Sequence, residues 1–122
     1  MSKAKVLIVD DEPFNIEVLE QALDGTDYQV VSSANGQEAW EKIQSEQPDL
    51  ILLDLMMPVM DGFAVLAKVK ENSMLRDIPI IIVSAEHDSK SVVKGIKQGA
   101  EDYLTKPVDT AQFLKKVKEF LG

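Results

Sequence analysis

The sequence has no cysteine and no apolar run near the roughly 20 residues that a membrane-spanning helix needs. Disulfide frameworks and thiolate metal sites are therefore excluded, and the absence of cysteine fits the reducing cytoplasm in which we expect the protein. The N-terminus, MSKAKVLIVDDE, is not expected to be a signal peptide, because acidic residues follow its short apolar run at once.

Basic residues are in the minority. The chain has 13 Lys and Arg against 21 Asp and Glu, which gives a formal net charge of -8 at pH 7. The surplus of acidic residues argues against direct nucleic-acid binding, which needs a surplus of Lys and Arg. It suits a divalent cation or a basic partner surface, although solubility alone is a simpler explanation.

Short apolar runs alternate with helical patterns along the 122 residues, a length typical of one domain, here 1–122. Runs that are apolar almost throughout are typical of strands buried on both faces of a parallel sheet. The pattern predicts an α/β protein with a doubly wound five-stranded parallel sheet in the order 2-1-3-4-5. Strands are predicted at 6–9, 29–32, 50–53, 78–83 and, in a less apolar run, 102–105.

Each predicted strand is followed by a helical pattern. The first helix is predicted to start at Pro13 and to stop before Gly25, where these residue types are favoured. The others are predicted at about 36–47, after Asp61-Gly62, at about 90–98 and at the end of the chain. Spacings of three and four predict which side chains face the core. They include Phe14, Val18, Leu19, Ala22 and Leu23 in the first helix, Val92, Val93 and Ile96 in the fourth, and Phe113, Leu114, Val117, Phe120 and Leu121 in the last.

Polar side chains stand where four of the predicted strands end. In an open parallel sheet, ligands bind outside the carboxyl ends of the strands. We therefore expect these side chains to share one pocket. They are Asp10, Asp11 and Glu12 after the first strand, Asp54 after the third, Ser84 at the end of the fourth, and Lys106 with Pro107 after the fifth.

Such a pocket has the parts needed for phosphoryl transfer. Clustered carboxylates repel each other, and a hard cation such as Mg²⁺, which prefers oxygen ligands, relieves the repulsion. Asp54, on a rigid strand end, is placed to attack phosphorus. Lys106 suits a phosphoryl oxygen as a point cation, and the Ser84 hydroxyl can donate to another.

Each residue also has a simpler interpretation. Asp11 could cap the first helix, and Asp54 could be only a polar strand end. Ser84 could be a loop hydroxyl, and Lys106 a solvated cation. Their coincidence at the predicted strand ends is what favours a shared site.

The chain resembles the receiver domain of two-component response regulators. The motifs that carry the resemblance cover almost the whole sequence, and their joint occurrence is specific. They are VLIVDDE at 6–12, DLILLDLMMPVMDG at 49–62, IPIIIVSAE at 78–86 and GAEDYLTKP at 99–107, followed by the closing helix.

The resemblance implies a role for each residue of the predicted pocket. Asp54 would accept a phosphoryl group from a sensor histidine kinase or a histidine phosphotransfer protein, and would share in metal binding. Asp11 would bind Mg²⁺ or Mn²⁺ directly, Asp10 through a water molecule, and Met56 through its backbone carbonyl. Lys106 would pair with the phosphoryl group.

The resemblance also implies a switch. Ser84 would turn toward the phosphoryl group, and Tyr103 would move inward behind it, which changes the face built from the last two helices and the strand between them. The peptide bond before Pro107 would be cis. Met56 and Glu86 would tune the lifetime of the aspartyl phosphate, although simple packing is the favoured interpretation of the Met56 side chain.

The implied protein is a signalling switch, not an ordinary enzyme, which catalyses only its own phosphorylation and slow dephosphorylation. Its partners would be the phosphodonor and a downstream target protein, with no direct nucleic-acid or membrane contact. The donor would dock on the first helix near Asn15; Ile16 either joins this contact or extends the buried stripe. Dimerisation on phosphorylation stays open, as does the choice between a stand-alone protein, like a single-domain chemotaxis regulator, and part of a longer one.

Three rival functions fit less well. A flavodoxin-like cofactor domain needs a phosphate-cradling loop after the first strand, where this chain has acidic residues. An aspartyl-phosphate hydrolase would place its nucleophile in an Asp-x-Asp pattern after that strand. A pseudo-receiver would have lost residues of the set Asp10, Asp11, Asp54, Ser84 and Lys106, which is intact here.

Overall fold

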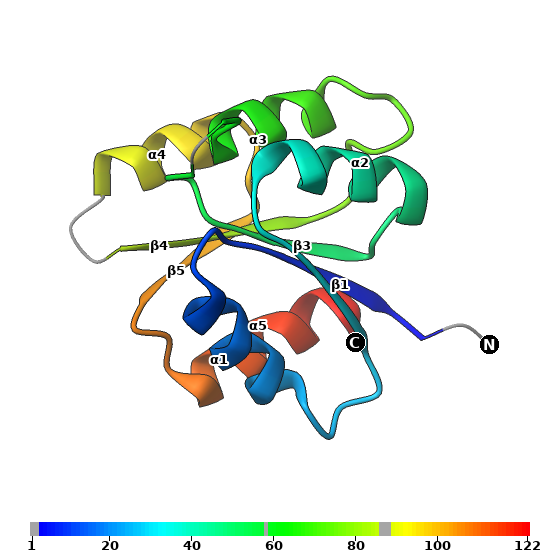
Figure 1. Ribbon diagram of the computed structural model, residues 1–122, viewed down its shortest axis with the longest axis vertical. Helices are drawn as coiled ribbons and strands as arrows, with labels where there is room; N and C mark the ends of the chain where they lie inside the picture. Colours follow the sequence, from blue (N-terminus) through cyan, green and yellow to red (C-terminus); the bar gives the residue numbers. More distant parts are fainter. Residues whose placement is uncertain (1–2, 58, 86–88) are drawn as a thin grey trace.

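Strands and helices alternate five times in the computed structural model, which describes residues 3–57, 59–85 and 89–122 (Figure 1). No helix in these ranges is long and apolar enough to cross a membrane. The elements are β1 (Lys5–Val9), α1 (Pro13–Leu23), β2 (Gln29–Ser33), α2 (Gly36–Glu46), β3 (Leu50–Leu53), α3 (Gly62–Lys70), β4 (Ile80–Ala85), α4 (Ser89–Lys97), β5 (Asp102–Lys106) and α5 (Thr110–Leu121).

The strands form one parallel sheet in the order β2-β1-β3-β4-β5, which confirms the predicted fold class. Figure 1 shows α1 and α5 on one face of the sheet and α2, α3 and α4 on the other. The strand register places Val9 beside both Ser33 and Leu53, so the carboxyl ends of the central strands lie together.

Alternate side chains of each central strand enter two separate cores. Leu7 and Leu53 pack toward α2, α3 and α4, whereas Ile8 and Leu52 pack toward α1 and α5. Because the strand side chains point alternately to the two faces, a strand covered on both sides is apolar at every position. This arrangement explains the continuous apolar runs of β1, β3 and β4.

Two helices expose side chains that the spacing pattern predicted to be buried. Phe14, in the first turn of α1, is 72% exposed, and Val93 and Ile96 of α4 are exposed too. In α4 the buried seam runs instead through Val92 and Gly95, because a Cβ atom on Gly95 would lie 2.3 Å from the Cδ1 atom of Ile82. Because the α4 backbone lies close to β4 at Gly95, Val93 and Ile96 face outward.

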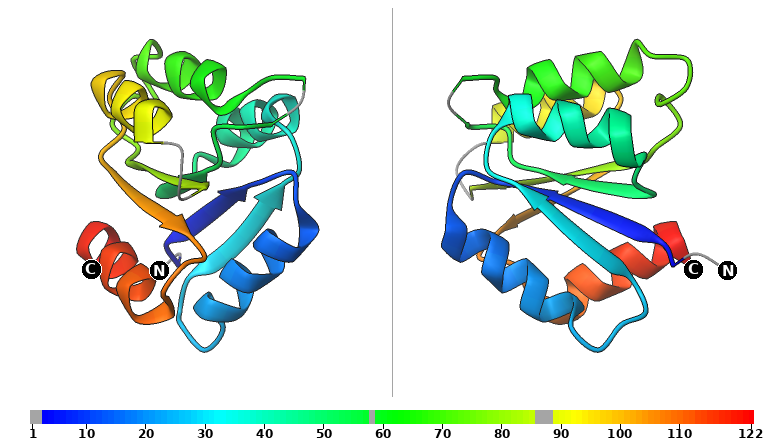
Figure 2. Two further views of the ribbon diagram at one scale, coloured as in Figure 1. Left: turned by 90° about the vertical axis from the view of Figure 1, so that its left-hand side faces the viewer. Right: turned by 45° about the vertical axis from the view of Figure 1, so that its right-hand side comes forward.

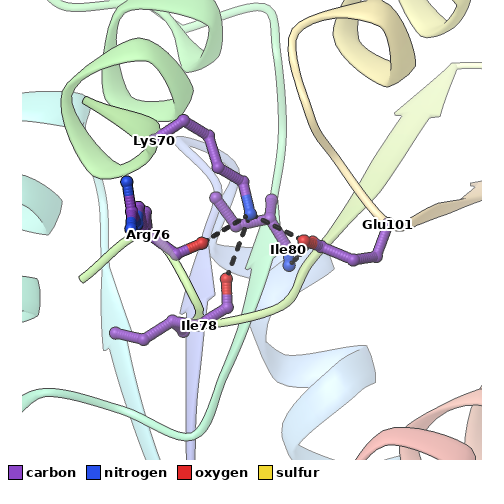
Figure 3. A network of polar contacts seen from close by, with 5 residues as sticks. All are labelled: Lys70, Arg76, Ile78, Ile80 and Glu101. Atoms are coloured by element: carbon purple, nitrogen blue, oxygen red, sulfur yellow. Dashed lines mark hydrogen bonds and ion pairs between the residues drawn. The ribbon is translucent and has the colours of Figure 1, made fainter. Parts of the chain in front are cut away.

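The amino edge of the sheet is held by a polar network (Figure 3). The Lys70 Nζ atom donates to the carbonyl oxygens of Arg76 at 3.1 Å and Ile78 at 3.5 Å, and lies 2.6 Å from the Glu101 Oε1 atom. The other oxygen of Glu101 accepts from the Ile80 N–H. These contacts join the end of α3, the start of β4 and the loop before β5, at the edge opposite the predicted site.

Candidate functional site

Three carboxylates meet at the carboxyl edge of the sheet. Asp10 directly follows β1 and Asp54 directly follows β3; both are buried, and Asp11 is half-buried. One carboxylate oxygen from each lies within 4.8 Å of the others. The fold thus brings together side chains that are 44 positions apart in the sequence.

Lys106, the last residue of β5, supplies the positive charge of this cluster. Its Nζ atom donates to the Asp10 Oδ2 atom at 2.8 Å and lies 3.5 Å from the Asp54 Oδ2 atom. Burial alone would lower the pKa of Lys106, but the hydrogen bond with Asp10 and the charges of Asp54 and Asp10 outweigh it and raise the pKa. Lys106 is therefore a permanent cation at neutral pH.

The environment of Asp54 disfavours its charged form. Burial is the largest cause and, with the nearby charges of Asp10 and Asp11, it raises the pKa of Asp54 from 3.8 to about 6. Lys106 and the Met56 N–H, which donates to the Asp54 Oδ1 atom at 3.2 Å, act in the opposite direction without cancelling this effect. One lysine does not balance three carboxylates, so the cluster favours an additional cation.

Asp11 is not the cap of α1, and that interpretation of the sequence is wrong. The helix begins at Pro13, Glu12 is the residue before it, and no side chain caps this end. The Glu12 N–H donates to the Asp10 Oδ1 atom at 2.9 Å. Three close oxygen ligands, none of them engaged in capping this helix, fit a hard cation such as Mg²⁺ better than a softer metal.

The other predicted residues belong to β4, to β5 and to the residues that follow these strands. The Ser84 Oγ atom is buried and has no hydrogen-bond partner among the described residues. Tyr103 of β5 is about half exposed, and the Lys106–Pro107 peptide bond is cis. Glu86 lies outside the described residues.

Met56 corrects a prediction made from the sequence. Its side chain is 64% exposed, so simple packing, the favoured interpretation, is wrong; the neighbouring Met57 is buried in the core instead. The exposed Met56 side chain follows Asp54 by two positions, and only its N–H contacts the Asp54 carboxylate in the described structure.

Gly62 supports the site in a way that its sequence context did not predict, since an Asp-Gly pair indicates only a turn. A Cβ atom at Gly62 would lie 2.4 Å from the Asp54 carbonyl oxygen, and the Gly62 N–H donates to the Leu55 carbonyl at 3.0 Å. The start of α3 therefore packs directly against the backbone of Asp54. The Asp-Gly pair before an apolar helix was the only available signal.

A doubly wound parallel sheet with three clustered carboxylates and a lysine at its carboxyl edge is typical of an α/β domain that binds its ligands at this edge. The family sequence model for the response regulator receiver domain matches residues 6–118, and the chain belongs to this family.

Relatives of different lengths support this membership. Protein PilH of Pseudomonas aeruginosa is 36% identical over 98% of both chains. The crystallised chemotaxis protein CheY4 of Vibrio cholerae is 32% identical, with a TM-score of 0.89, over 98% of this chain and 100% of that one. The chain spans only about a quarter to a half of the length of several other curated relatives.

A further solved structure carries a metal. It is the receiver domain of the sensor histidine kinase PA1611 from Pseudomonas aeruginosa, with a magnesium ion coordinated in its active-site cleft. It is 28% identical to this chain, covers 99% of both chains and has a TM-score of 0.89.

Proposed function

We propose that this protein is the phosphoacceptor of a two-component phosphorelay and that Asp54 receives the phosphoryl group. The observation that carries the proposal is the approach of the Asp10, Asp11 and Asp54 carboxylates to within 4.8 Å of one another beside Lys106. The phosphodonor is a phosphohistidine on a sensor histidine kinase or a histidine phosphotransfer protein. The domain that acts as this switch spans residues 1–122.

The transfer step uses Asp54 as the nucleophile. One carboxylate oxygen forms a bond to phosphorus while the bond from phosphorus to the donor's imidazole nitrogen breaks, and the electron pair stays on that nitrogen. The product is an aspartyl phosphate, a mixed anhydride, which water later cleaves slowly. Because little covalent chemistry is left to the protein, catalysis consists mainly of positioning and charge stabilisation.

Lys106 and Ser84 stabilise the transferred group. The Lys106 ammonium, already 3.5 Å from Asp54, can pair with a phosphoryl oxygen. The Ser84 hydroxyl has no acceptor among the described residues, and a phosphoryl oxygen would supply one. Both residues thereby gain interactions that exist only after phosphorylation.

A divalent cation, Mg²⁺ or Mn²⁺, fits this site. Asp11 and Asp54 would hold it directly, Asp10 through water, and Met56 through its backbone carbonyl. When bound, the cation neutralises charge that builds up on the phosphoryl oxygens. The raised pKa of Asp54 supports the proposal, because a cation beside this carboxylate restores its charged, nucleophilic form.

The output surface is the face of α4, β5 and α5. A groove of about 530 Å³ lies between α4 and β5, lined by apolar side chains that include Val93, Ile96 and Tyr103. A phosphoryl group adds about 1.5 to 2 negative charges at Asp54, which draws Ser84 toward it and leaves space for Tyr103 to turn inward. The changed groove then binds or releases a downstream target protein.

Intact-mass spectrometry tests the proposal. The protein is incubated with acetyl phosphate and Mg²⁺, beside the Asp54→Asn variant. We expect one phosphoryl adduct, which is lost without Mg²⁺ and is absent from the variant. An adduct that persists in Asp54→Asn would place the acceptor at another residue. If no adduct forms under any condition, the protein has the receiver fold but not the proposed chemistry.

A further inference from the structure

The loop between β3 and α3, residues 54–61, carries two of the proposed cation ligands. The Asp54 backbone is held by the sheet, because its N–H donates to the Val9 carbonyl at 2.9 Å. Met56 lies beyond the end of β3, so the direction of its backbone carbonyl depends on the path of the loop. The contacts that fix this path therefore also fix a proposed cation ligand.

The loop follows a strained path. The φ angle of Val59 is 70°, in the left-handed region that is rare for a β-branched residue. The Val59 side chain is 90% exposed, so its own burial does not compensate for the strain. Strain of this kind persists only where the surroundings hold the backbone in place. The Gly62 N–H, which donates to the Leu55 carbonyl at 3.0 Å, closes the base of the loop, and its far part needs a support of its own.

Gly36, the first residue of α2, provides such a support. A Cβ atom at Gly36 would lie 2.1 Å from the carbonyl oxygen of Met60 and 2.8 Å from its carbonyl carbon and its Cβ atom. The α2 backbone is therefore in direct contact with the Met60 backbone, and the left view of Figure 2 shows the loop passing beside the start of α2. The Met60 side chain completes the contact by packing against the core cluster that includes Ala39 and Ile43 of α2.

The contact with Met60, and not the local backbone, requires glycine at position 36. Three other glycines have positive φ angles, whereas Gly36 does not. Alanine would otherwise be favoured there, because it forms helices more readily than glycine. The start of α2 is anchored independently, since the Asn35 side chain accepts from the Glu38 N–H at 2.8 Å. A Cβ atom at position 36 would therefore displace the loop more readily than the helix.

We propose that Gly36 is a positioning residue for the divalent cation, an inference that rests on the proposed function. The absence of a side chain lets α2 support the loop at Met60, and this support aims the Met56 carbonyl at the cation. Gly36 acts through the loop and not on the cation itself.

The closeness of the contact indicates how strongly a side chain would disturb the site. Cβ atoms do not approach other atoms closer than about 3.0 Å, so alanine at position 36 must displace Met60 by about 1 Å. Mg²⁺ requires near-ideal octahedral geometry, and its ligand distances vary by only about 0.2 Å. Even a small part of the displacement, passed on to Met56, exceeds this tolerance. Loss of contacts that orient metal ligands typically weakens metal affinity about 10- to 100-fold.

Isothermal titration calorimetry with Mg²⁺ alone measures the affinity of the wild type and of Gly36→Ala. Gly25→Ala is the matched control, because the φ angle of Gly25 is 85° and alanine strains the backbone there, while no described residue other than its chain neighbours would lie within 4 Å of the new Cβ atom. Urea denaturation without Mg²⁺ shows whether both variants are folded and measures their loss of stability. Met60→Ala is a second variant, which loosens the loop without adding a clash, and Met74→Ala, at an exposed methionine, is its control.

We expect Gly36→Ala to raise the Kd for Mg²⁺ about tenfold, and Met60→Ala to raise it about threefold or more. Gly25→Ala and Met74→Ala should leave the Kd within about twofold of wild type, although Gly25→Ala also loses stability. In phosphorylation by acetyl phosphate, the Mg²⁺ concentration that gives half of the maximal rate should rise by the same factor in Gly36→Ala. The rate at saturating Mg²⁺ should stay within about twofold of wild type, because Asp54 and Lys106 are unchanged.

Several results would overturn the inference. An unchanged Kd in folded Gly36→Ala would mean that the contact serves packing alone. An equal rise in Gly25→Ala would mean that Mg²⁺ affinity follows overall stability. If Gly36→Ala does not fold, an unchanged Kd in Met60→Ala overturns the inference instead. A wild type that binds no Mg²⁺ refutes the cation site and this inference together, whereas a wild type that binds Mg²⁺ but forms no adduct refutes only the proposed phosphoryl transfer.

Discussion

Replacing Asp54 with asparagine should stabilise the protein at neutral pH. The side chains have similar size, but asparagine carries no charge to bury. Burial and the neighbouring Asp10 and Asp11 raise the pKa of Asp54 from 3.8 to about 6, so the folded protein holds this proton more tightly than the unfolded chain does. The free energy of unfolding therefore falls as the pH rises from 3.8 to about 6, and the loss is complete above this range.

The magnitude follows from the two pKa values. A carboxyl group that shifts from 3.8 to about 6 on folding destabilises the folded state by about 1 kcal/mol at pH 4.5 and by about 3 kcal/mol at pH 7. Asp54→Asn removes this dependence. The difference in the free energy of unfolding between variant and wild type should therefore grow by about 2 kcal/mol between these two pH values.

Urea denaturation with a chelator present, at several pH values from 4.5 to 7, measures this difference. Glu41→Gln removes a charge from an exposed position of α2 and serves as the control, with a pH-independent difference expected. Added Mg²⁺ should stabilise the wild type at pH 7 more than Asp54→Asn. A difference between Asp54→Asn and wild type that does not change with pH would refute the argument that burial disfavours the Asp54 carboxylate.

Three further substitutions probe the surroundings of the cleft. Lys106→Met leaves the buried Asp10 without its 2.8 Å partner, so denaturation should show a loss of about 3 kcal/mol, and adduct formation should slow. Gly62→Ala places a Cβ atom 2.4 Å from the Asp54 carbonyl oxygen, which should cost about 2 kcal/mol by denaturation and slow phosphorylation measured by intact mass. Tyr103→Ala should leave adduct formation intact but abolish the change in amide exchange of α4 that we expect on phosphorylation.

Each of these has a contradicting result. Lys115→Met, on the exposed side of α5, is the control for Lys106→Met, and equal effects of the two would mean that Lys106 acts only as a surface charge. A Gly62→Ala protein with normal stability would show that the turn before α3 adapts freely. Loss of phosphorylation in Tyr103→Ala would place this side chain in the chemistry and not in the output.

The sequence was sufficient to predict the sheet but not every helix face. A strand covered on both sides must be apolar at each position, so β1, β3 and β4 could be read directly. Helix faces depend on how the helix is rotated against the sheet. In α4 that rotation is set by the contact between Gly95 and Ile82, which joins residues 13 positions apart, and the spacing of apolar residues alone misplaced Val93 and Ile96.

The clustering of Asp10, Asp11, Asp54 and Lys106 was predictable because the parallel strands place their carboxyl ends at one edge of the sheet. What could not be predicted depends on the local backbone. The exposure of Met56, the contact of Gly62 with Asp54 and the left-handed conformation of Val59 all arise in the segment between β3 and α3. Apolar periodicity predicts helices and strands but not the backbone of an irregular connecting segment. The sequence therefore did not predict these three features.

Several unfavourable local features lie at the carboxyl edge of the sheet. Asp54 is a carboxylate in a place that favours its neutral form, Ser33 and Ser84 have buried hydroxyls without partners among the described residues, and Val59 is strained. At the amino edge, by contrast, Lys70 has an acidic partner and carbonyl acceptors. Under the proposed function, a cation would offset the cost at Asp54 and a phosphoryl oxygen the cost at Ser84.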